Sequence, residues 1–89
     1  MKAKHFLMMK HEYDRGDIIL DFIIHDKENV AQILKYPVGG FTMPYGMCYI
    51  GDRRFHRDDY ASLEVARETW REAIRLGWKP HEKDILSAK

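Results

Sequence analysis

The chain has 89 residues, of which 45% are hydrophobic, and its net charge is only +1 because 15 basic residues face 14 acidic ones. This length allows one domain with one core, and the hydrophobic content argues against a globally disordered chain. The balanced charge argues against a protein that binds nucleic-acid phosphates mainly by electrostatics, since such domains carry a basic excess.

The cysteine count and the N-terminus indicate the compartment. Cys48 is the single cysteine and cannot form an internal disulfide, which is typical of a reducing cytoplasm. Residues 1–11 lack the apolar run of a signal peptide, and no stretch is long enough to span a membrane. We therefore expect a soluble, cytoplasmic protein with no membrane partner.

Two strands are predicted in the first part of the chain. Residues 4–13 have a short apolar centre between polar ends, and residues 18–25 read I-I-L-D-F-I-I-H, rich in β-branched side chains. The turn signal at 14–17 joins them.

Both faces of the second strand are apolar. Alternation places one set toward the C-terminal helix: Leu20, Phe22 and Ile24. Ile19 and Ile23 then share the opposite face with Asp21, so we expect this second face to be covered as well. A dimer partner or a small helix would cover it.

Residues 26–36 leave two structures open. Asp26 could cap a short helix near 27–35, in which Val30, Ile33 and Leu34 share a face. A strand over 30–36 fits the same residues, and a proline follows either one.

A glycine- and proline-rich loop spans 37–46 and carries three apolar side chains, Phe41, Met43 and Tyr45. These side chains either pack into the core or form a contact surface. A hairpin then follows, with arms at 47–50 and 53–57 and its turn at Gly51-Asp52; Phe55 is the inward residue of its second arm.

An amphipathic helix is predicted over 62–76. Ser62 is its N-cap, and Gly77 is suited to its end. Trp70 lies on the apolar stripe and is expected in the core, whereas Trp78 fits either the core or a binding surface. The predicted class is α+β, a small antiparallel sheet of about four strands packed on this helix, with one domain over 1–80 and a flexible tail over 81–89.

The helix also carries a recognisable pattern, A-R-x-x-W followed by G-W. Its residues are Ala66, Arg67, Trp70, Gly77 and Trp78. The pattern resembles the closing helix of small uncharacterised proteins found in cyanobacteria. It is a packing motif, and the resemblance implies no activity.

Catalytic and metal-binding patterns are weak. The histidines are scattered, and the best local cluster is His56 with Asp58, which share a face in a strand and could form a small metal or enzyme site. Cys48 has no activating neighbour in sequence. The patterns therefore favour a protein that is not an enzyme and has no cofactor.

A nucleic-acid-binding domain is the main alternative. Arg53, Arg54, His56 and Arg57 surround Phe55 on one hairpin arm, and the layout of such a ribbon before a helix resembles AP2-type DNA-binding domains. The three arginines are matched by three aspartates in the same segment.

The preferred hypothesis is a non-enzymatic protein–protein interaction or assembly module, regulatory in role, that acts as a homodimer or an adaptor. Arginine and aromatic residues are enriched where proteins contact one another. The predicted partner-binding residues are Phe41, Met43, Tyr45, Arg53, Arg54, Phe55, Arg57 and Trp78.

Overall fold

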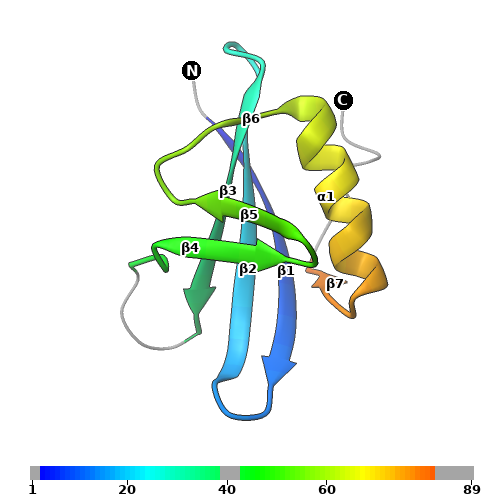
Figure 1. Ribbon diagram of the computed structural model, residues 1–89. Helices are drawn as coiled ribbons and strands as arrows, with labels where there is room; N and C mark the ends of the chain where they lie inside the picture. Colours follow the sequence, from blue (N-terminus) through cyan, green and yellow to red (C-terminus); the bar gives the residue numbers. More distant parts are fainter. Residues whose placement is uncertain (1–2, 39–42, 82–89) are drawn as a thin grey trace.

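The computed structural model of the chain describes residues 3–38 and 43–81 (Figure 1). Its elements are, in chain order, β1 (Lys4–Glu12), β2 (Gly16–His25), β3 (Val30–Pro37), β4 (Met47–Ile50), β5 (Arg53–His56), β6 (Ala61–Ser62), α1 (Leu63–Arg75) and β7 (Lys79–Pro80). None of the helical structure in these residues is long and apolar enough to cross a membrane.

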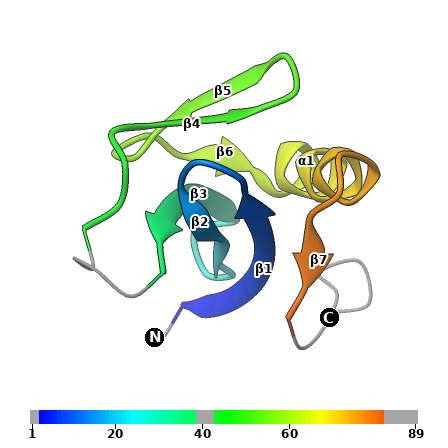
Figure 2. The ribbon, with the colours of Figure 1, turned by 90° about the horizontal axis from the view of Figure 1, so that it is seen from below.

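The strands form two sheets. The main sheet is antiparallel and has the order β6-β3-β2-β1-β7, and β4 pairs with β5 in a separate hairpin. Figure 2 shows α1 and the β4–β5 hairpin on the same side of the three long strands. The predicted α+β class, with an antiparallel sheet packed on a C-terminal helix, is confirmed. The hairpin arms form a sheet of their own, and β3, β6 and β7 add to the predicted number of strands.

The short helix considered near 27–35 is wrong, because the chain forms strand β3 over Val30–Pro37. So short a helix is only marginally stable in water, whereas β3 pairs with the edge of β2 along its whole length. The turn before it uses Asn29 with φ 65°, a left-handed conformation that asparagine tolerates better than most residues. In the resulting register Ile33 lies opposite Phe22 and points into the core.

The core lies between the main sheet and the layer formed by α1 and the hairpin. Trp70 of α1 is fully buried, and its ring meets Phe22 of β2 edge to face at 4.9 Å between centroids. Cys48 and Ile50 close the core from the hairpin side. The predicted core position of Trp70 is therefore confirmed.

Both predicted helix ends are confirmed. Ser62 Oγ accepts a hydrogen bond from the Val65 N–H at 3.1 Å. At the other end Gly77 takes φ 103°, its N–H donates to the Ile74 carbonyl, and the Trp78 N–H donates to the Ala73 carbonyl. These two bonds make a Schellman motif, which folds Trp78 back against the core.

Gly77→Ala should therefore destabilise the protein by about 1–2 kcal/mol, because a Cβ is strained in this left-handed conformation. The strain comes from the backbone alone, since the nearest atom to an added Cβ is Lys10 Cε at 3.8 Å. Urea denaturation measures the change. Gly46→Ala is the matched control, because Gly46 has open space around it and is not among the positive-φ glycines; an equal loss in both variants would contradict the motif.

Candidate interaction surface

The three long strands carry a second apolar face, turned away from α1 and the hairpin, which we call the outer face. Its apolar side chains are Leu7, Met9, Ile19, Ile23, Val30, Leu34 and Tyr36. Its polar side chains are His5, His11, Asp17, Asp21, His25 and Gln32. An antiparallel sheet with one solvated face usually carries polar residues there, so this composition is unusual for a free surface.

The outer face forms a cluster of its own. Ile23 and Leu34 are each only 8% exposed, yet neither belongs to the core that α1 and the hairpin build. In the register His5 and Gln32 stand directly opposite Ile23, and Asp21 stands opposite Leu34; such cross-strand neighbours shield one another. The face is thus partly closed by its own side chains and lacks a covering helix or strand among the described residues.

The segment that leads from β5 to β6 borders this face along β3. The Gln32 amide nitrogen donates to the Arg57 carbonyl at 3.5 Å, and the ring of Tyr60 lies 5.6 Å from that of His25. The segment thus lies along the outer edge of β3 and reaches His25 at the end of β2.

A carboxylate lies at the centre of the outer face. Asp21 is 5% exposed, and the Nδ1 atom of His5 lies 3.0 and 3.1 Å from its two oxygens. Burial raises the pKa of the Asp21 carboxyl, and the hydrogen bond and charge of His5 oppose that rise. Burial also raises the pKa of Tyr36, with a further contribution from the Asp21 charge.

Two further histidines on this face have polar partners. His11 Nδ1 lies 2.9 Å from Asp17 Oδ1, and His25 Nε2 lies 2.9 Å from the Gln32 side-chain oxygen. The histidines are scattered along the sequence. In β1 and β2 they stand at alternating positions that point to the outer face. This shared face follows from the sequence once the register of the two strands is known.

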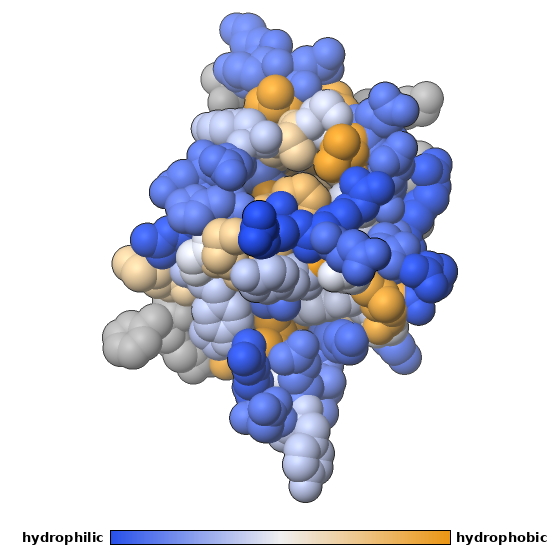
Figure 3. Space-filling model, in the orientation of Figure 1, coloured by the Kyte–Doolittle hydropathy of each residue, from blue (hydrophilic) through white to orange (hydrophobic). Residues whose placement is uncertain are grey.

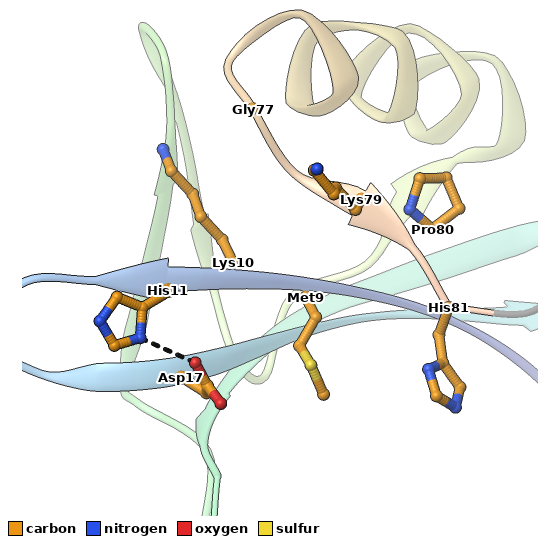
Figure 4. A pocket seen from close by; sticks show the side chains of 8 residues that line it. All are labelled: Met9, Lys10, His11, Asp17, Gly77, Lys79, Pro80 and His81. Atoms are coloured by element: carbon orange, nitrogen blue, oxygen red, sulfur yellow. Dashed lines mark hydrogen bonds and ion pairs between the residues drawn. The ribbon is translucent and has the colours of Figure 1, made fainter.

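A cavity of about 570 Å³ opens at the edge of this face, between β1 and β7. It is lined by Met9, Lys10, His11, Asp17, Gly77, Lys79, Pro80 and His81. Figure 4 shows Met9, Asp17 and His81 on one side of β1 and Lys10 on the other. Lys10 Nζ donates to the Leu76 carbonyl at 3.0 Å and so caps α1, which leaves Met9 and Pro80 as the apolar walls.

The predicted partner-binding residues do not form one surface. Phe41 lies outside the described residues; Met43 is 65% exposed, whereas Tyr45 and Phe55 pack against the core. Trp78 is only 4% exposed because the Schellman motif turns it inward, so of its two predicted roles the core is correct and the partner surface is wrong.

The hairpin arginines are also divided. Arg53 pairs with Glu68 of α1 at 3.1 Å, and Arg57 Nη1 donates to the Pro44 carbonyl at 3.2 Å. Arg54 stands opposite Tyr49 on the solvent side of the hairpin. A ribbon that reads a DNA groove needs its basic side chains on one face, and these three point to different neighbours.

The geometry strengthens neither the metal or enzyme site considered at His56 and Asp58 nor a reactive role for Cys48. His56 Nδ1 accepts a hydrogen bond from the Asp58 N–H at 3.2 Å, and the Asp58 carboxylate lies 3.7 Å from the same nitrogen. Within residues 3–38 and 43–81 there is no group of three or more His, Cys, Asp or Glu side chains that could hold a metal ion. Cys48 is 2% exposed, and burial raises the pKa of its thiol to about 11.

Cys48 should therefore resist alkylation in the folded protein, because the thiolate is the reactive form and is scarce at mildly alkaline pH. Mass spectrometry after iodoacetamide treatment should show unmodified protein in buffer and complete modification in denaturant. Rapid modification of the folded protein would contradict the buried position.

The face that carries α1 and the hairpin looks different from the outer face. Figure 3 shows it largely hydrophilic, with separate hydrophobic patches.

Comparisons with protein families, curated proteins and solved structures find no match to this chain.

Proposed function

We propose that this protein is a non-enzymatic protein–protein interaction module that binds its partner on the outer face of the sheet. The observation that supports the proposal is the apolar second face of β1, β2 and β3, over which no described helix or strand lies. A partner that covers Leu7, Met9 and Ile19 removes their remaining apolar surface from water, which is the main driving force of association.

The chain offers two matched variants that test this proposal. Leu7→Ser with Met9→Ser changes two partly buried outer-face residues. Tyr49→Ser with Arg54→Ser changes the solvent side of the hairpin, which belongs to the partner surface predicted from sequence.

Sedimentation velocity of the wild type reports self-association, and selection from a displayed random peptide library reports affinity for other chains. If the wild type self-associates or binds peptides, we expect the outer-face variant to lose that binding and the hairpin variant to keep it. The reverse pattern, or an absence of both kinds of binding, would overturn the proposal.

The nucleic-acid alternative is tested in the same experiment by adding short duplex DNA and single-stranded RNA. A complex whose affinity falls steeply with salt and disappears in the hairpin variant would assign the function to Arg54 and its neighbours.

A further inference from the structure

The outer face has an unusual charge pattern for a chain rich in basic residues. Among the described residues of β1, β2 and β3, strand alternation points every lysine to the inner face, the one that packs on the core. The only formal charges on the outer face of these strands are the carboxylates of Asp17 and Asp21. Lys79 of β7 pairs with Met9 and lies beyond the edge of these three strands. Two interstrand spacings separate β7 from β2, which places Lys79 about 10 Å from β2. The face is therefore apolar and acidic, while the whole chain carries +1.

Asp21 is the central charge of this pattern, and the described residues satisfy only part of its hydrogen-bonding capacity. An ionised carboxylate accepts about four hydrogen bonds. The Nδ1 atom of His5, on a side chain that is 54% exposed, is the donor recorded at both of its oxygens. A partner that covers the face removes the remaining water from Asp21, so it must supply a donor or leave a buried charge poorly compensated.

A second copy of this chain is a poor match in a face-to-face arrangement. It would bring another apolar face with its own Asp17 and Asp21. The described residues of β1, β2 and β3 on that face offer histidines but no lysine or arginine, and Lys79 of β7 lies at its edge, beside the cavity. Carboxylates of like charge would then lose water together, which opposes association unless they are protonated.

We propose that the outer face binds a segment of another protein that presents a lysine or arginine between apolar side chains, with the cationic group on the Asp21 carboxylate. This inference rests on the proposed function and names its partner chemistry. The apolar flanks of the segment lie over Leu7 and Met9 on one side and Leu34 on the other, and the cavity beside Met9 receives a terminal apolar side chain.

The probe is the set of peptides enriched from a random displayed library on the wild-type protein. We expect them to contain lysine or arginine flanked by apolar residues. Asp21→Asn should weaken their binding about tenfold or more, because a charge-assisted hydrogen bond is lost while the side-chain shape is kept. Asp52→Asn is the control, because Asp52 is exposed in the turn of the hairpin and lies off the outer face, and it should leave the affinity nearly unchanged.

A double-mutant cycle decides whether the basic side chain meets Asp21. Citrulline in place of the peptide arginine, or norleucine in place of lysine, removes the charge. It should weaken binding to the wild type but not weaken binding to Asp21→Asn any further. Thermal melting of each variant confirms that it is folded.

Three results would overturn this inference: enriched peptides without a basic residue, independent effects of the two substitutions, or a homodimer that the Leu7→Ser/Met9→Ser variant abolishes. None of these results contradicts the outer face as the binding surface. Only binding that ignores the outer-face variant, or no binding at all, contradicts the proposed function itself.

Discussion

Trp70→Ala should lower the free energy of unfolding by about 3–5 kcal/mol and the melting temperature by on the order of 20 °C. The indole is fully buried between α1 and the sheet and meets Phe22 edge to face. Its removal leaves a cavity that the surrounding residues, packed at the density of a protein interior, can only partly close. This loss is comparable to the whole stability expected of a small domain.

Trp70→Phe is the control for this substitution. Within the described chain the Trp70 Nε1 atom is buried without a hydrogen-bond partner, so phenylalanine removes an unsatisfied donor together with part of the ring. We expect it to cost clearly less than alanine. A melting temperature of Trp70→Ala close to that of the wild type would show that α1 packs with another face on the sheet.

His5→Ala should destabilise the protein by about 1–3 kcal/mol at neutral pH, because it leaves the buried Asp21 carboxylate without its donor. The pH dependence follows from the pKa of Asp21, which burial raises and His5 holds down. Without His5 the folded-state pKa rises further. A carboxyl with a raised folded-state pKa loses stability as the pH rises through that pKa, so the deficit should vanish below about pH 4.

Thermal melts across this pH range measure the deficit. His11→Ala is the matched control, because His11 and its partner Asp17 are both exposed and should give no pH-dependent loss. Adding Asp21→Asn to His5→Ala should recover stability at neutral pH, since it removes the uncompensated charge. A deficit of equal size at all pH values would mean that His5 acts by packing and not through Asp21.

Local sequence signals predicted much of the fold, because short-range interactions decide the elements concerned. The hairpin around Gly51 and the helix between Ser62 and Gly77 each have their own turn or cap chemistry, and the structure confirms them. Residues 26–36 carry one local signal, the possible cap Asp26, and the chain does not form the helix that it favoured. Their strand depends on pairing with β2, a long-range contact that local patterns do not contain.

The candidate site was predicted only in part. The alternation of Ile19, Asp21 and Ile23 indicated a second apolar face, and the register confirms that they share it. Its members from β1 and β3 could not be assigned, since a one-residue shift of register would turn each strand over. The predicted contacts at the hairpin were inferred from composition. Strand alternation had already predicted an inward position for Phe55, which the structure confirms, and Trp78 takes the core position of the two that the sequence left open.

Methyl-resolved NMR of the protein titrated with its tightest selected peptide, or diluted if it self-associates, tests the binding surface most directly. Neighbouring residues on one strand serve as internal controls, because alternation points them to opposite faces. The proposal predicts that the methyl signals of Leu7, Met9 and Ile19 shift while those of Met8, Ile18 and Leu20 stay in place. Shifts confined to the Met47 methyl of the hairpin, with the outer-face signals unmoved, would contradict it.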